Sequence, residues 1–339
     1  MAFLDALHFL SNLSVSKVCN AVLVYTSFYL AKWLQKPIAW GMPFTISVEP
    51  TTSCNLGCPE CPSGLKSFTR PTGNLELSLY KKLVDETHRH LLYMYFYFQG
   101  EPYLHPQFLE MVKYASDKKI YTVTSTNAHF LTERKARETV QSGLSRILIS
   151  IDGTTQDTYE QYRIGGTLEK VIEGTKNLIA AKRELKSSTP HIVFQFLVVK
   201  PNEHQTEEVK KLAAELGVDE VKFKTAQIYD YKNGHELIPT VAEYSRYKKA
   251  ADGTYQIKNE LKNQCWKMWH SNVVTWDGKV VPCCFDKDAQ HQMGHISTNS
   301  ISEIWHNEAY IQFRKKLISG RKEIDICTNC SEGTKVWAD

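Results

Sequence analysis

Between residues 44 and 225 short apolar runs alternate with longer segments of helical periodicity, and this alternation constrains the fold more than any other feature. The apolar runs are rich in β-branched and aromatic residues, which favour strands. We expect strands at residues 44–49, 92–98, 121–125, 146–151, 192–199 and 220–224. The intervening periodicity predicts helices at residues 78–90, 107–118, 132–142, 168–185 and 203–216.

Strands that alternate with helices along a chain pair in parallel through right-handed crossovers. Several of the expected strands are apolar on both faces, as buried parallel strands are. The pattern therefore predicts an α/β fold, either an open or partial barrel or a doubly wound sheet. In each of these folds the functional side chains gather where the strands end.

The charge balance argues against a nucleic-acid partner, because 41 basic residues face 37 acidic ones and the net charge is only +4. A length of 339 residues predicts about two domains. The N-terminus has neither a basic leader nor a small-residue cleavage site, so we expect a cytoplasmic protein. In a reducing compartment, clustered cysteines hold metal more often than they form disulfides.

Three of the nine cysteines, Cys54, Cys58 and Cys61, lie within eight residues and directly follow the first expected strand. A compact loop of thiolates suits an iron–sulfur cluster, and three ligands leave a fourth iron open for a substrate or cofactor. A zinc site would require a fourth ligand close by. The sequence offers none within the loop, which favours the cluster.

A second group, Cys265, Cys283, Cys327 and Cys330, lies in the last quarter of the chain. Four thiols suffice for one fully ligated cluster, and a structural zinc site is the alternative for this group. The same region predicts short strands around a turn at Asp277–Gly278 and one helix over residues 301–318. We expect Cys284 and Cys19 to be small buried residues without a ligand role.

The C-x3-C-x2-C loop after the first strand resembles the signature of the radical S-adenosylmethionine (SAM) superfamily. The resemblance implies a partial (β/α)6 barrel. It also implies a 4Fe–4S cluster that reductively cleaves SAM to a 5′-deoxyadenosyl radical, which abstracts a hydrogen atom from a substrate. No acid or base on the substrate side can be named from the sequence.

Further segments at successive strand ends are similar to motifs of the same family. Gln99-Gly100-Glu101-Pro102 resembles a GGEP motif with Gln in place of the first Gly, and Thr126-Asn127-Ala128 resembles TNG with Ala in place of Gly. Ser150-Ile151-Asp152-Gly153 resembles SxDG, and Arg163 resembles an arginine that binds the SAM carboxylate. The resemblance thus implies that SAM is bound by Glu101 (at its ammonium), Asn127, Ser150, Asp152 (at the ribose or carboxylate end) and Arg163.

The C-terminal cysteines resemble those of SPASM domains and their shorter twitch form, which implies an auxiliary 4Fe–4S cluster. We therefore divide the chain into an N-terminal helical extension (1–43), the barrel (44–230), a bridging segment (231–264) and the auxiliary-cluster domain (265–339). The resemblance also implies a reductase or flavodoxin-type electron donor. It favours a peptide or protein substrate over a small molecule. A zinc-binding interaction protein without catalytic activity is the alternative.

The N-terminal extension contains an apolar stretch over residues 18–31 that Asn20, Thr26 and Ser27 interrupt. It is too short to cross a membrane, which takes about 20 apolar residues. We expect a helix docked on the protein's own core. Contact of residues 1–36 with a membrane surface, carrier or leader peptide is the competing interpretation.

Overall fold

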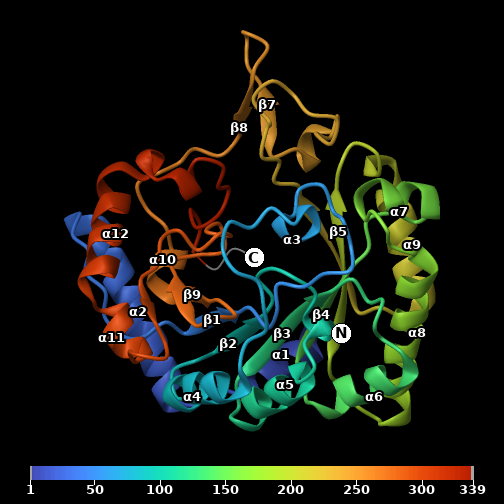
Figure 1. Ribbon diagram of the computed structural model, residues 1–339, viewed down its shortest axis with the longest axis horizontal. Coiled ribbons are helices and arrows are strands. Elements are labelled where there is room, and N and C mark those ends of the chain that lie inside the picture. The colour runs from blue at the N-terminus through green and yellow to red at the C-terminus, as the bar shows by residue number, and fades with distance from the viewer. Residues whose placement is uncertain (1, 337–339) are drawn as a thin grey trace.

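The computed structural model describes residues 2–336, and its centre is one nine-stranded sheet in the order β11-β10-β9-β1-β2-β3-β4-β5-β6 (Figure 1). Strands β1 to β6 are all parallel, with each strand pairing to the next along the chain. Their bounds are Thr45–Val48, Tyr93–Phe96, Tyr121–Thr126, Arg146–Ser150, His191–Val198 and Glu220–Thr225. The predicted α/β fold of six parallel strand–helix units is confirmed.

Helices cover the outer face of these strands (Figure 1). The helices predicted from periodicity are α4 (Leu77–Thr87), α5 (Phe108–Asp117), α6 (Glu133–Gln141), α8 (Leu168–Glu184) and α9 (Thr206–Leu216). Two shorter helices, α3 (Pro62–Leu65) and α7 (Gln156–Tyr162), follow the ends of β1 and β4. The helix expected over residues 203–216 begins with a 3₁₀ turn at Glu203–Gln205.

The two faces of β2 show how the sheet divides the molecule. Met94 and Phe96 are fully buried in the core. Tyr93 and Tyr95, on the opposite face, are only half-buried and their rings stack 6.2 Å apart. Tyr97 continues this row, with its ring 5.4 Å from that of Tyr95. The strand therefore presents a row of tyrosines to the inside of the partial barrel.

The C-terminal part continues the sheet of the barrel, which the sequence did not predict. After α10 (Lys267–His270), strand β9 (Ser271–Val274) pairs in parallel with β1. Strands β10 (Lys279–Val281) and β11 (Gly294–His295) extend it by antiparallel pairing. The turn expected at Asp277–Gly278 joins β9 to β10.

The single helix expected over residues 301–318 is wrong. The segment forms α11 (Ile301–Trp305) and α12 (Glu308–Gly320), separated at His306 and Asn307. The Asn307 side chain accepts a hydrogen bond from the Tyr310 backbone N–H and so caps the second helix. An N-cap residue has extended backbone geometry, and this interrupts what would otherwise be a continuous helix.

Between β6 and α10 the chain runs through residues 226–266, which include the whole bridging segment expected at 231–264. They contain a two-stranded antiparallel sheet of β7 (Tyr247–Lys249) and β8 (Tyr255–Ile257), which projects from the body of the molecule at the top of Figure 1. Ala226, Ile228 and Leu237 of this segment pack in one apolar cluster with Cys58 of the first cysteine loop. The bridging segment therefore forms part of the wall around that loop.

Helix α1 (Ala2–Ser11) lies against the N-terminal ends of the barrel strands. Asp5 pairs with Arg146, the first residue of β4, and accepts a hydrogen bond from Tyr121, the first residue of β3. Phe9 stacks on Tyr93 at a ring distance of 5.0 Å. The helix thus closes the barrel at the end opposite to the cysteine loop.

Helix α2 (Val15–Leu34) docks through Phe28, whose ring lies 5.1 Å from Trp266 and 5.6 Å from Trp269. In the described part of the chain no single helix is long and apolar enough to cross a membrane; α1 and α2 together reach that length only as a pair bent by 103°. The expectation that Cys19 lies in the core is wrong, because this residue is exposed on α2.

Candidate active site

The first cysteine loop follows β1 and wraps around the short helix α3. The loop is held in place by the Gly57 backbone N–H, which donates to the Ile164 carbonyl at 2.9 Å. At Gly64 a Cβ atom would lie 2.5 Å from the Cys58 nitrogen, so only glycine permits this close wrapping. Cys58 is buried, whereas Cys54 and Cys61 are half-buried.

Burial raises the pKa of Cys54 to about 11 and also raises the pKa of Cys58, where the nearby Arg163 partly offsets it. Thiolates are thus costly here until a positively charged metal centre compensates them. Three thiols on one compact loop, with two of them reachable from outside, form a donor set that fits an iron–sulfur cluster with one open iron. Cys54, Cys58 and Cys61 would hold it.

Glu101 lies at the end of β2, buried beside the cysteine loop. Its carboxylate accepts hydrogen bonds from the Thr126 hydroxyl and the Asn127 backbone N–H, both at 2.8 Å. Its own N–H donates to the Ser53 carbonyl at 2.7 Å, next to Cys54. Burial raises the pKa of Glu101 to about 7, and the hydrogen bonds counteract part of that rise. The Tyr103 N–H also donates, at 3.2 Å, to the oxygen that Thr126 contacts, so the other carboxylate oxygen keeps a lone pair that suits a cationic ligand group.

Gly100 is essential to this placement. Its φ is +75°, and a Cβ atom would lie 2.2 Å from the Thr51 carbonyl oxygen. Its N–H donates to the Ser63 hydroxyl of α3 at 2.9 Å. Gln99 replaces the first Gly of the GGEP motif, and its side-chain oxygen lies 3.9 Å from the Cys61 sulfur. The substitution therefore places an amide beside a cysteine while the glycine and the glutamate keep their positions.

Arg163 and Asp152 form a buried ion pair after β4. The second Asp152 oxygen accepts the Leu197 backbone N–H at 2.7 Å, so both oxygens of this carboxylate have partners within the protein. Arg163 also directs Nη1 to the Cys58 sulfur at 3.7 Å. Asp152 thus orients Arg163, and the guanidinium of Arg163 faces the cysteine loop.

Asn127 and Ser150 complete the predicted SAM-binding set. The Asn127 amide donates to the Asn55 side chain at 2.8 Å and so links β3 to the cysteine loop. Ser150 is buried at the end of β4, in register with Gln195. The structure thus gathers the whole predicted set at the C-terminal ends of β2, β3 and β4; their individual contacts with SAM remain predictions.

The second cysteine group converges on a small cavity. Four predicted ligands line it, Cys265, Cys283, Cys327 and Cys330, together with Arg321, Lys267 and Glu332. The backbone N–H of Glu332 points to the Cys330 sulfur at 3.3 Å, and that of Phe285 to the Cys283 sulfur at 3.5 Å. Burial raises the pKa of Cys330 to about 12. Four thiols with backbone donors around one cavity fit a fully ligated iron–sulfur cluster.

Two neighbours fix the shape of this cavity. At Gly333, whose φ is +74°, a Cβ atom would lie 2.4 Å from the Cys265 sulfur, so a larger residue would displace this ligand. Arg321 is fully buried and directs Nη2 to the Cys330 sulfur at 3.4 Å. Cys284 is half-buried beside Cys283 and does not line the cavity.

The sequence did not identify the polar groups between the two cysteine sites. Lys287 donates to the Tyr229 hydroxyl at 2.8 Å, and the Tyr229 backbone N–H donates to Glu60 at 2.9 Å. Burial lowers the pKa of Lys287, although the neighbouring Cys61 and Cys284 partly oppose this effect. Lys287 is thus near enough to Cys61 of the first loop and to Cys284, the neighbour of Cys283, to be influenced by both. Its only sequence signal is its position three residues after Cys284.

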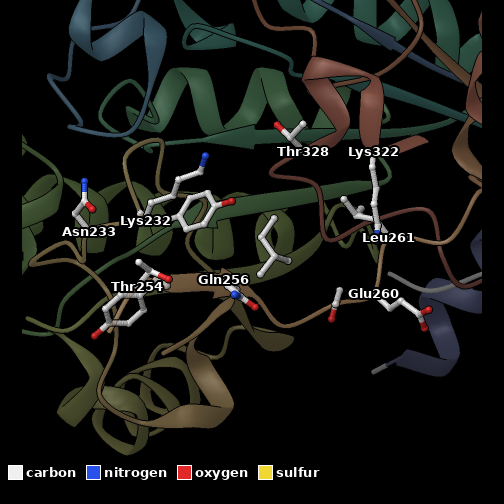
Figure 2. A pocket seen from close by; sticks show the side chains of 12 residues that line it. Lys232, Asn233, Thr254, Gln256, Glu260, Leu261, Lys322 and Thr328 are labelled. Atoms are coloured by element: carbon white, nitrogen blue, oxygen red, sulfur yellow. The ribbon is translucent and has the colours of Figure 1, made fainter. Parts of the chain in front are cut away.

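An open hollow of about 560 Å³ lies beside the β7–β8 hairpin. Figure 2 shows Lys232, Asn233 and Thr254 on one side of it and Lys322 and Thr328 on the other. Tyr231, Tyr255 and Ile257 also line the hollow and pack against the apolar cluster that contains Cys58. The hollow therefore adjoins the apolar cluster to which Cys58 belongs.

Comparison with known proteins agrees with this geometry. Residues 48–213 match the model of the radical SAM superfamily, and residues 265–331 match the SPASM iron–sulfur cluster-binding domain. The cofactor-modifying protein of the tungsten-containing aldehyde ferredoxin oxidoreductase of Pyrococcus furiosus is 29% identical over 317 residues, covering 84% of this chain and 86% of the relative. PqqA peptide cyclase of Bradyrhizobium diazoefficiens is 24% identical over 300 residues, covering 81% and 76%.

Among solved structures, Streptococcus suis SuiB bound to its precursor peptide SuiA shares the fold with a TM-score of 0.63 and 13% identity, covering 88% of this chain and 72% of SuiB. These findings do not favour a zinc-binding protein without catalytic activity. They establish 4Fe–4S clusters and SAM as the cofactors. The chain belongs to the radical SAM superfamily and carries a C-terminal SPASM domain.

Proposed function

We propose that this enzyme removes a hydrogen atom from a peptide or protein substrate and that the net reaction is an oxidation. The observation that carries the proposal is the convergence of Glu101 and Arg163 on the cysteine loop. When bound, the cluster and SAM supply one-electron chemistry able to take hydrogen from an unactivated C–H bond. The protein's contribution is to bind, orient and shield the reacting groups.

Glu101 and Arg163 have complementary charges for the two ends of an amino acid. The buried Glu101 carboxylate would accept a hydrogen bond from the SAM ammonium group. Arg163, oriented by Asp152, would bind the SAM carboxylate. Both groups are nearly or fully buried, so each ionic contact forms in a low-dielectric environment where it is strong.

A peptide substrate is supported by the relatives and by the shape of the bridging segment. PqqA peptide cyclase is named for a peptide, and SuiB was solved with its precursor peptide. The hollow beside β7 and β8 is open and lined with both polar and aromatic groups, as an extended peptide requires. We propose that it takes the part of the substrate remote from the reacting residue.

Lys287 and Tyr229 are our candidates for the substrate side. The lowered pKa of Lys287 increases the fraction of its amine that is unprotonated and so able to accept a proton, and the hydrogen-bonded Tyr229 hydroxyl holds the amine in place. An oxidation that begins with loss of a hydrogen atom also releases a proton and an electron. We propose that Lys287 takes the proton and that the SPASM site takes the electron.

The test is anaerobic reconstitution with iron and sulfide, followed by assays for 5′-deoxyadenosine and for modified peptide. We expect Lys287→Met to retain 5′-deoxyadenosine formation and iron content but to lose product. A matched variant, Lys232→Met on the wall of the hollow, should lower peptide affinity and leave turnover at saturation unchanged. Full product formation by Lys287→Met would remove Lys287 from the mechanism. Absence of 5′-deoxyadenosine from the wild-type protein would contradict the proposed reaction.

A further inference from the structure

The two N-terminal helices contact the protein through both polar and apolar side chains, and they leave many large apolar side chains exposed. The inward face of α2 combines polar Lys17, Asn20 and Ser27 with apolar Val24, Phe28 and Ala31. Lys17 donates to the Asn12 carbonyl at 3.1 Å, and the Asn20 amide exchanges hydrogen bonds of 2.9 and 2.7 Å with the Met42 backbone. A surface helix in water turns its apolar stripe to the core and polar residues to the solvent, whereas α2 carries large apolar residues on its exposed side as well.

The outward side carries a continuous series of large apolar residues, which we call the N-terminal apolar face. Its members are Phe3, Leu4, Leu7, Leu10, Val15, Val18, Val22, Leu23, Tyr25, Tyr29, Trp33 and Leu34. Val15 is 80% exposed and Trp33 is 82% exposed. Exposed apolar patches of this extent mark a surface that binds a partner or a membrane.

The exposed charges of residues 2–48 all have one sign. Lys32 and Lys36 are exposed at the C-terminal end of α2. At the corner between α1 and α2, the exposed Arg89 and Lys119 accept hydrogen bonds through their carbonyls from Ser16 and Lys17. The one carboxylate among residues 2–48, that of Asp5, is buried in its pair with Arg146. The rim is therefore cationic.

We propose that the N-terminal apolar face lies in the surface of a lipid bilayer that contains anionic headgroups. Aromatic residues such as Trp33 and Tyr29 favour the boundary between headgroups and acyl chains, and Lys32 and Lys36 would meet anionic headgroups. The bend of 103° between the two helices suits a pair that lies along the interface. A second copy of the chain would have to place two cationic rims side by side, which favours the bilayer.

The apolar face adjoins the N-terminal ends of the barrel strands, because Asp5 and Phe9 contact the first residues of β4 and β2. The cysteine loop lies at the opposite ends. Binding would thus anchor the enzyme with its active site turned toward the aqueous phase. This inference does not depend on the substrate or on the reaction proposed above.

The experiment is vesicle flotation of the anaerobically reconstituted full-length chain, with phosphatidylcholine vesicles that contain or lack phosphatidylglycerol. We expect the wild-type chain to float with the anionic vesicles. In Leu23→Asp/Trp33→Asp the vesicle partition coefficient should fall by about tenfold or more, because two large apolar side chains are lost. Leu185→Asp/Val241→Asp, which alters two exposed apolar residues on other surfaces, is the matched control and should float like the wild type.

Lys32→Glu/Lys36→Glu should abolish the preference for anionic over neutral vesicles. Iron content and thermal unfolding of each variant establish that it is folded. Equal flotation of the Leu23→Asp/Trp33→Asp and control variants would overturn the proposal, as would failure of the wild type to bind either vesicle at low salt. If the wild type instead dimerises without lipid and Leu23→Asp/Trp33→Asp is monomeric, the face is an interface between copies and not a membrane surface.

Discussion

The two cysteine sites contain the same kinds of residue, but the arginine beside each site has different hydrogen-bond partners. Each has one arginine that reaches a cysteine sulfur, at 3.7 Å from the partly buried Arg163 to Cys58 and at 3.4 Å from the fully buried Arg321 to Cys330. Arg321 also donates to the backbone carbonyls of Gln264 and Glu332 at 2.7 and 2.8 Å, which belong to the protein itself. In the described structure the Arg163 guanidinium makes hydrogen bonds only with the Asp152 carboxylate and the Cys58 sulfur, and it lies 5.6 Å from the centre of the Tyr162 ring.

The burial of the thiols also differs between the two sites. In the first loop two of three thiols are half-buried, whereas three of the four in the SPASM site are buried and all four line a cavity. The first site has one thiol fewer and an arginine with donors that the protein does not use. We therefore expect the first site to exchange a ligand and the second, with four thiols, to be fully ligated.

The largest effect should come from removing one thiol at each site. Cys58→Ala and Cys330→Ala should each halve the iron content, from about eight to about four per chain. Only Cys58→Ala should abolish 5′-deoxyadenosine formation, because four thiols line the SPASM cavity and leave no iron open for SAM. Iron analysis and product chromatography measure both quantities. If Cys330→Ala also stopped SAM cleavage, the two sites would not be separable in function.

A smaller effect is expected when Glu101 loses its charge. Glu101→Gln should weaken SAM binding by about tenfold to a hundredfold, since a buried charge-assisted hydrogen bond contributes about 1.5–3 kcal/mol. Equilibrium dialysis of the reconstituted protein measures the affinity. Asp286→Asn, which alters another buried carboxylate near the SPASM site, is the control and should bind SAM normally.

The same residue gives a pH dependence. Because burial raises the pKa of Glu101 to about 7, the carboxylate that binds the ammonium is lost as pH falls through that value. SAM affinity should thus be lower at about pH 6 than at about pH 8, with proton release on binding near neutrality. The stability of the SAM-free chain has the opposite sign: it falls as pH rises from the ordinary glutamate range toward 7. A flat affinity profile would mean that Glu101 is ionised throughout.

Arg321→Lys tests whether the two arginines have different roles. Lysine can keep one of the contacts with Cys330, Gln264 or Glu332 but cannot keep the whole set. We expect faster loss of iron from the SPASM site under a chelator, by about threefold to tenfold, with unchanged SAM affinity. Arg163→Lys should do the reverse and weaken SAM without releasing that iron. Identical behaviour of the two variants would contradict the division of roles.

The smallest effect should follow Cys284→Ala. Its thiol does not line the SPASM cavity, although the adjacent Cys283 does. Iron content and SAM cleavage should both stay within experimental error of the wild type. A loss of iron comparable to that in Cys330→Ala would make Cys284 a ligand.

The sequence predicted what depends on local pattern. The six parallel strands followed from apolar runs, and the cysteine groups followed from spacing, because both signals lie in contiguous residues. The roles of Asp152 and Lys287 could not be predicted, since each depends on a contact with a distant segment: Leu197 for the first and Tyr229 for the second. The outward position of Cys19 was missed for a related reason. An apolar helix gives the same periodicity whether its stripe faces a core or a membrane.

The pairing of β9 with β1 has a consequence for biosynthesis. Thr45 pairs with Ser271, so the first barrel strand lacks its outer neighbour until most of the chain has been synthesised. Until β9 has been synthesised, β1 is an exposed edge strand that can pair with other chains. Truncation before residue 271 should therefore cause aggregation and not a soluble enzyme with one cluster. The late closure also leaves a period during translation in which the first cysteine loop is open to a cluster donor, and to oxygen.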